Sequence, residues 1–181
     1  MNAKTIQVKD KTFALSIPEA DIQRQVTRVA AEINRDYAGQ QPVFLAVLNG
    51  SFVFAADLLR QIDLPCEISF VKLASYQGTS TTGEIREMIG LNIDITDRPV
   101  IIVEDIVDTG LTMAHMMETL SKQNPKSIDI CSFFVKPQKL QVKLDIRYSC
   151  MEIPNDFIVG YGLDYDGYGR NTRDIYTVVN N

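Results

Sequence analysis

Residues 100–113 (VIIVEDIVDTGLTM) place an apolar run directly before a group of acidic and hydroxyl side chains. Glu104 and Asp105 are adjacent, and ionised carboxylates can only accept hydrogen bonds. Two neighbouring acceptors suit the hydroxyl donors of a vicinal diol, or a hard divalent cation such as magnesium. The alternative is a pair of solvated acids at the start of a loop, which does not explain why an apolar strand ends on them.

The second half of this stretch suits a phosphate group. Its residues lead into an expected helix, so their backbone N–H groups can face one anion at the helix N-terminus. A plain strand–turn–helix, with Thr112 as the helix cap, would be the better interpretation of the tripeptide DTG alone. Joined to the two acids, the loop instead indicates a ligand with ribose hydroxyls beside a 5′-phosphate. The residues proposed to hold that phosphate are Asp108, Thr109, Gly110, Leu111 and Thr112.

Buried strands and amphipathic helices would hold these side chains in place. Residues 42–48 form a continuously apolar run, which is typical of a strand buried on both faces. A capping box formed by Ser16 and Glu19, followed by an apolar face, predicts a helix over 16–38. Further helices are expected at 52–62 and 111–123, and further strands at the start of 100–113 and at 66–76, 85–94, 127–135, 146–153, 157–161 and 175–179.

The alternation of strands and helices predicts an α/β fold with a central, mainly parallel sheet flanked by helices. Ligands in such sheets bind beyond the carboxyl ends of the strands, where the loops lead into helices. Residues 48–51 and 104–110 are two such loops, so we expect them at the same edge of the sheet. The octet 77–84 (QGTSTTGE) has no apolar side chain and is expected to be a long mobile loop.

Length, charge and cysteine content limit the class of protein. The 181 residues predict one domain, 1–181, with a substantial core. The net charge of −5 and the lack of a basic run argue against a nucleic-acid partner. No apolar run approaches the length of a membrane span or signal peptide, so we expect a cytoplasmic protein without a membrane partner. Cys66, Cys131 and Cys150 form no C-x-x-C pair and are expected to be buried free thiols.

The pattern of four apolar residues, two acids, two apolar residues and D-T-G-x-T resembles the phosphoribosyl-pyrophosphate motif of type I phosphoribosyltransferases. From about residue 43 to 176 the chain resembles the hypoxanthine-guanine phosphoribosyltransferases in particular. Four more segments carry this resemblance, in the family's order. They are LNGSFVFAADL (48–58), SYQGTSTTGE (75–84), VKP (135–137) and DFIVGYGLDYDGYGR (156–170).

The resemblance implies a fold with a small hood formed from the terminal segments, and a reaction. In that reaction 5-phosphoribosyl 1-pyrophosphate and hypoxanthine or guanine give a nucleoside monophosphate and pyrophosphate, with Mg²⁺. Asp108 would accept a proton beside purine N7, and a flexible catalytic loop would cover about 75–86, including Ser75 and Tyr76. The other implied contacts are Glu104 and Asp105 with the ribose hydroxyls; Asn49, Gly50 and Arg170 with pyrophosphate; Lys136, Phe157, Ile158 and Asp164 with the purine; and Glu104, Asp105 and Asp164 with the metal.

The chain departs from the family pattern at Asn49, where many members have lysine. The family often has a cis peptide bond just before the glycine of this loop, so the Leu48–Asn49 bond is expected to be cis. The resemblance also implies a homodimer or homotetramer. A regulator that senses nucleotides with the same fold, and a relative that prefers xanthine or guanine, are the alternative functions.

Overall fold

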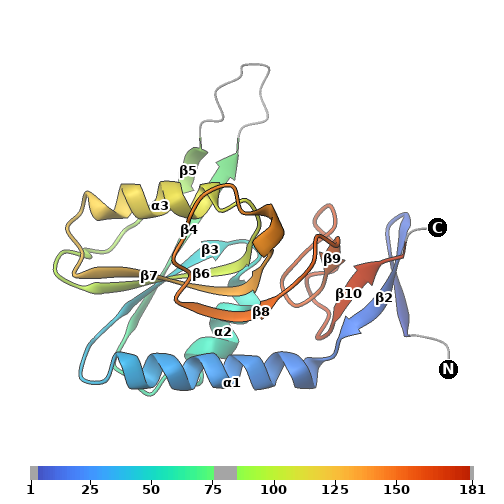
Figure 1. Cartoon of the computed structure of the whole chain (residues 1–181), viewed down its shortest axis with the longest axis horizontal. Coiled ribbons are helices and arrows are strands. Elements are labelled where there is room, and N and C mark those ends of the chain that lie inside the picture. The colour runs from blue at the N-terminus through green and yellow to red at the C-terminus, as the bar shows by residue number, and fades with distance from the viewer. Residues whose placement is uncertain (1–3, 76–84, 180–181) are drawn as a thin grey trace.

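A computed structural model describes residues 4–75 and 85–179, with the backbone alone described at 73–75 and 85–89. Its larger part is a six-stranded sheet in the order β5-β4-β3-β6-β7-β8 (Figure 1). Neighbouring strands from β4 to β8 are parallel, whereas β5 is antiparallel to β4. The mainly parallel sheet predicted from the sequence is therefore confirmed. The strands are β3 (Val43–Leu48), β4 (Glu67–Ser75), β5 (Ile85–Ile89), β6 (Pro99–Val107), β7 (Ser127–Val135) and β8 (Tyr148–Glu152).

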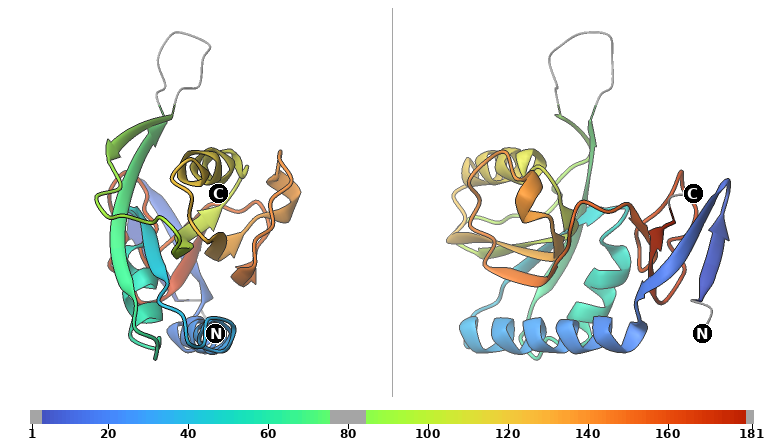
Figure 2. Two further views of the ribbon diagram at one scale, coloured as in Figure 1. Left: turned by 90° about the vertical axis from the view of Figure 1, so that its left-hand side faces the viewer. Right: turned by 45° about the vertical axis from the view of Figure 1, so that its right-hand side comes forward.

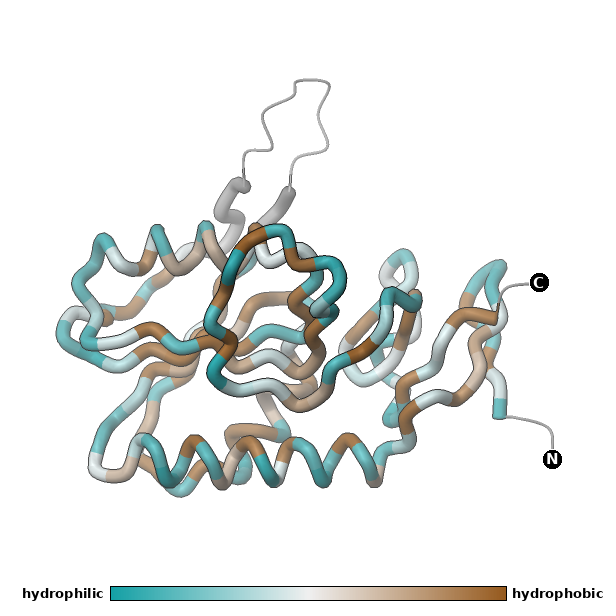
Figure 3. Tube along the Cα trace, in the orientation of Figure 1, coloured by the Kyte–Doolittle hydropathy of each residue, from teal (hydrophilic) through white to brown (hydrophobic). Residues whose placement is uncertain are grey.

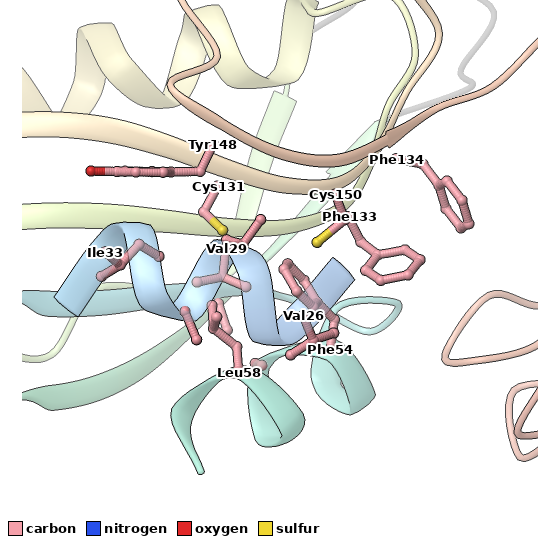
Figure 4. Close-up of a cluster of buried hydrophobic side chains, with 14 of the residues drawn as sticks. Val26, Val29, Ile33, Phe54, Leu58, Cys131, Phe133, Phe134, Tyr148 and Cys150 are labelled. Atoms are coloured by element: carbon pink, nitrogen blue, oxygen red, sulfur yellow. The ribbon is translucent and has the colours of Figure 1, made fainter. Parts of the chain in front are cut away.

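Helices cover both faces of this sheet, and the central strands are apolar for that reason. In β3, Phe44 and Ala46 pack in the core beneath α1 and α2, whereas Val43 and Leu45 pack in the core beneath α3. Figure 4 shows the first core, where side chains of α1 and α2 meet those of β7. Alternate side chains thus enter opposite cores, and no position in the strand can be polar without cost. The helices are α1 (Glu19–Asp36), α2 (Phe52–Leu59) and α3 (Leu111–Ser121).

The terminal segments form a second, four-stranded antiparallel sheet in the order β1-β2-β10-β9. It lies beside the main sheet, beyond the N-terminal end of α1 (Figure 2). This is the small hood that the family resemblance implied. Local sequence patterns do not predict β1 or β2. β1 pairs with β2, and β2 pairs in turn with β10 near the far end of the chain. The strands are β1 (Thr5–Val8), β2 (Lys11–Ile17), β9 (Ile158–Val159) and β10 (Ile175–Val178).

The expected capping box at the start of α1 is wrong. The helix begins at Glu19, its N-cap is Pro18, and no side chain of the cap residue hydrogen-bonds to it. Ser16 belongs to β2, and its Oγ donates to the carbonyl of Ile175 at 3.2 Å. The backbone N–H of Glu19 instead donates to Asp174 Oδ1 at 2.8 Å. The N-terminus of α1 is therefore capped from the C-terminal segment.

The remaining predictions need smaller corrections. Hydrophobic and hydrophilic residues alternate along α1 (Figure 3), as the predicted apolar face requires. Cys131 and Cys150 are buried free thiols, but Cys66 is exposed because it precedes β4 in a surface connection. The strand expected at 85–94 ends at Ile89. None of the described helices is both long and apolar enough to cross a membrane.

Candidate active site

Three loops meet beyond the carboxyl ends of β3 and β6, which are neighbours in the sheet. A methyl group added at Gly50 would lie 1.4 Å from Asp105 Oδ2, so the carboxylate rests directly against the glycine backbone. A methyl group at Gly162, where φ is +98°, would lie 2.2 Å from the carbonyl oxygen of Gly50. Both glycines are required by close approach, and Gly162 also by its left-handed backbone. The structure thus brings residues 48–51, 104–110 and 160–164 together.

The two adjacent acids at the end of β6 occupy different environments. Glu104 is buried, and Asp105 is partly buried. The backbone N–H of Asp105 donates to Glu104 Oε1 at 3.1 Å, and that of Ile106 donates to Asp105 Oδ1 at 2.9 Å. Loss of solvent, followed by the nearby charge of Asp105, raises the pKa of Glu104 well above its ordinary value. A cation or hydroxyl donors at this position would stabilise the ionised form.

Residues 108–112, the anion loop, follow β6 and are those that the sequence predicts to hold a phosphate. Gly110 is the N-cap of α3 and adopts φ +81°. Thr109 Oγ1 accepts a hydrogen bond from the N–H of Leu111 at 3.4 Å, whereas the cap residue is a glycine and has no side chain that could bond to the helix. Thr112 lies past the cap, so it does not serve as the N-cap. Residues lining the pocket at this loop are Glu104, Ile106, Val107, Asp108, Thr109, Gly110, Thr112 and Met113.

Of the two carboxylate oxygens of Asp108, one is hydrogen-bonded to another described residue and the other is not. Its Oδ2 accepts a hydrogen bond from Lys139 Nζ at 3.1 Å. Its Oδ1 is buried and has no hydrogen-bond partner among the described residues. A buried, unpaired carboxylate oxygen costs free energy, which is typical of a group whose partner is a ligand. Sequence patterns do not single out Lys139, because nothing local connects it to a residue 31 positions earlier.

The residues expected to bind the purine lie beside this loop. The backbone N–H of Lys136 donates to the carbonyl of Val107 at 3.0 Å, which joins the ends of β7 and β6. The Lys136 side chain is buried, and its Nζ donates to the carbonyl of Asp156 at 3.0 Å. Phe157 is 44% exposed although its ring packs edge-on against Tyr165, with 5.6 Å between centroids. The ring is thus held by a neighbouring aromatic side chain while part of its area remains exposed. Ile158 is buried in β9.

Asp164 and Arg170 form an ion pair next to the converging loops. Arg170 Nη2 lies 2.6 Å from Asp164 Oδ1, and its Nη1 donates to the carbonyl of Gly162 at 2.7 Å. Asp164 Oδ2 accepts from the N–H of Gly167 at 2.6 Å. No group of three or more metal-ligating side chains occurs among the described residues. A magnesium ion at Glu104, Asp105 or Asp164 would therefore need ligands from substrate and water, which is its common mode of binding.

Two further expectations concern the loops. The Leu48–Asn49 peptide bond is cis, as expected. Ser51, buried just after it, donates its hydroxyl to the carbonyl of Val47 at 2.6 Å and closes the turn. Ser75 is the last residue of β4, whereas Tyr76 and the rest of the expected catalytic loop up to residue 84 lie outside the described residues.

Comparison with known proteins gives matches along nearly the whole chain. Residues 19–166 match the model of the phosphoribosyl transferase domain. The hypoxanthine-guanine phosphoribosyltransferase of Aquifex aeolicus is 36% identical over 174 residues, 95% of this chain and 98% of that protein. The hypoxanthine phosphoribosyltransferase of Salmonella typhimurium is 38% identical over 171 residues, 93% and 96% of the two chains. A crystal structure of a hypoxanthine-guanine phosphoribosyltransferase from Bacillus anthracis, 36% identical, has a TM-score of 0.87 and covers 99% of this chain and 100% of that chain.

Proposed function

The chain belongs to the phosphoribosyltransferase family, and we propose that it transfers a 5-phosphoribosyl group to hypoxanthine, and also to guanine. The donor is 5-phosphoribosyl 1-pyrophosphate, and the products are IMP or GMP and pyrophosphate, a purine salvage reaction. The observation that carries this proposal is the hydrogen bond between the Lys136 N–H and the Val107 carbonyl. It joins the loop suited to a ribose phosphate directly to the residues suited to an oxopurine.

Asp108 is the proposed proton acceptor. Purine N9 forms a bond to ribose C1 as the bond from C1 to the pyrophosphate oxygen breaks, with its electron pair leaving on pyrophosphate. The proton on N7 then passes to the Asp108 carboxylate. Its position in the anion loop supports this role, as does its Oδ1, which has no hydrogen-bond partner in the described part of the chain. Proton transfer of this kind contributes about 10²–10⁴-fold to a rate.

Lys136 is proposed to recognise the substituent at the purine 6-position. An ammonium group has three donors and no acceptor, and one donor is used by the Asp156 carbonyl. The remaining donors suit the 6-oxo group of hypoxanthine or guanine. The 6-amino group of adenine is itself a hydrogen-bond donor, so it is not a suitable partner for the Lys136 ammonium. Phe157 would stack on the base, and the backbone of Ile158 would meet the exocyclic edge.

The other site residues divide between ribose and pyrophosphate. Glu104 and Asp105 would accept hydrogen bonds from the ribose hydroxyls, and residues 108–112 would hold the 5′-phosphate. The backbone at Asn49 and Gly50 and the guanidinium of Arg170 would hold pyrophosphate, since the planar fork of arginine binds phosphate oxygens in pairs. Magnesium, when bound by these acids and the donor, would neutralise the charge that develops on the departing pyrophosphate.

Steady-state turnover of four bases with one donor tests the proposal. Hypoxanthine and guanine should react only with magnesium present, and adenine should not react. Turnover of xanthine measures how strongly the site discriminates between substituents at the purine 2-position. Efficient turnover of adenine, or no turnover of any oxopurine, would contradict the assignment. The control is enzyme treated with a chelator, whose activity should return when magnesium is added back.

A homodimer or homotetramer is the proposed oligomeric state. Ile68 and Phe70 lie two residues apart on β4 and are exposed, so they share one face of the strand. Phe52 is exposed at the start of α2. Light scattering after size exclusion would distinguish these states from the 20.3 kDa monomer.

A further inference from the structure

The ion pair between Lys139 and Asp108 is the feature of the site that neither the motifs nor the proposed reaction uses. The two side chains are 37% and 42% exposed, and Lys139 Nζ lies 3.1 Å from Asp108 Oδ2. An exposed pair of this kind adds little to stability. Here, however, one of the two partners is the proposed proton acceptor, so its orientation matters for the reaction.

The backbone fixes Lys139 opposite Asp108. Lys139 ends a short 3₁₀ turn, and its N–H donates to the carbonyl of Lys136 at 3.0 Å. Hydrogen bonds on either side of Asp108 tie this segment to the loop. The N–H of Lys136 donates to Val107 O at 3.0 Å, and the N–H of Gln141 donates to Thr109 O at 2.9 Å. Both arms of the segment are therefore anchored, and the lysine side chain begins from a defined place.

Side-chain packing holds the same segment against the loop. A methyl group at Gly110 would lie 2.7 Å from Leu144 Cδ1, 3.0 Å from Val142 Cγ2 and 3.3 Å from Leu140 Cδ2. Three apolar side chains thus cover the glycine that precedes α3. The segment after β7 and the anion loop form one packed unit, and Lys139 is the residue of that unit that contacts the Asp108 carboxylate.

We infer that Lys139 is a positioning residue for Asp108. Its ammonium binds Oδ2 and so fixes the plane of the carboxylate that is proposed to accept the purine N7 proton. Oδ1 of that carboxylate has no hydrogen-bond partner among the described residues. Displacement of a reacting group by about 1 Å can cost up to about 100-fold in rate. This inference rests on the proposed function, because it requires Asp108 to be the proton acceptor.

Turnover of Lys139→Met tests the inference, with Lys143→Met as the matched control. Lys143 is an exposed lysine of the same segment and is not one of the residues proposed to form the site. Lys139→Met should lower kcat for hypoxanthine about 10-fold, with the KM for the ribosyl donor changed less than about threefold. Lys139→Arg should restore kcat to within about threefold of the wild type, since guanidinium also donates to carboxylate. Melting temperatures should agree within about 3 °C.

A double-mutant cycle shows whether Lys139 acts through Asp108. In an Asp108→Asn background, Lys139→Met should change kcat less than about twofold, because the group that it orients has lost its function. Equal losses in both backgrounds, a selective rise in donor KM, or an increase in kcat would each overturn the inference. If the wild type is active, Asp108→Asn is impaired and Lys139→Met is not, only this inference fails. A wild type without oxopurine turnover contradicts the proposed function itself, and the inference with it.

Discussion

Replacing Glu104 with glutamine is expected to stabilise the fold at neutral pH while it weakens binding of the ribosyl donor. Burial, followed by the charge of Asp105, raises the pKa of Glu104 in the folded protein. Glutamine has the same shape and never ionises, so it removes the cost of holding a charge at this position. It also removes an acceptor proposed for the ribose hydroxyls, so donor affinity should fall.

The size of the stability gain follows from the direction of that pKa shift. Below the ordinary value of 4.5, Glu104 is protonated in both folded and unfolded states, so wild type and variant should be similarly stable. As pH rises above 4.5, the unfolded chain releases its proton before the folded chain does, and the wild type loses stability. The difference grows by about 1.4 kcal/mol per pH unit until the folded pKa is reached. Each pH unit over which the two states differ in protonation thus corresponds to roughly 3–6 °C in melting temperature for a chain of this size.

Thermal and urea unfolding of both proteins between pH 4 and pH 8 would measure this difference. Glu118→Gln is a suitable control, since Glu118 lies on the exposed face of α3 and pairs with Lys122 at 3.1 Å. The free-energy difference for Glu104→Gln should increase with pH, whereas the control should show no comparable increase. Parallel curves for wild type and Glu104→Gln would refute the reasoning, because they would mean that Glu104 titrates alike in both states.

Three other substitutions test the loops and the α1 cap. Gly50→Ala should raise the donor KM roughly 10- to 100-fold, because the new methyl group must displace the Asp105 carboxylate; near-normal kinetics would contradict that contact. Asp174→Ala should lower the free energy of unfolding by about 1 kcal/mol through loss of the cap on the Glu19 N–H, as urea denaturation would measure. Asn49→Lys should leave turnover within about threefold, since backbone N–H groups are proposed to bind pyrophosphate. A strong rise in pyrophosphate affinity on titration would instead assign that binding to the side chain.

The sequence alone determined the features that depend on neighbouring residues. The strand at 42–48, the helix from 111 and the anion loop between β6 and α3 are each specified within a dozen positions, by apolar runs, helical spacing and a glycine. The parallel sheet followed from their alternation. Placement of the acids at the carboxyl edge followed in turn, because every strand-to-helix loop of such a sheet ends there.

Tertiary structure decided the features that join distant segments. The pairing of β2 with β10 brings Ile17 beside Ile175, 158 positions later in the chain. The Asp174 cap of α1 joins residues 155 positions apart through a hydrogen bond of 2.8 Å, and the ion pair between Lys139 and Asp108 joins residues 31 positions apart at 3.1 Å. A capping box read from Ser16 and Glu19 was plausible locally and still wrong, because β10 offered Ser16 a strand partner. Local patterns fix backbone preference, but a side chain takes its partner from whichever chain segment packing brings within reach.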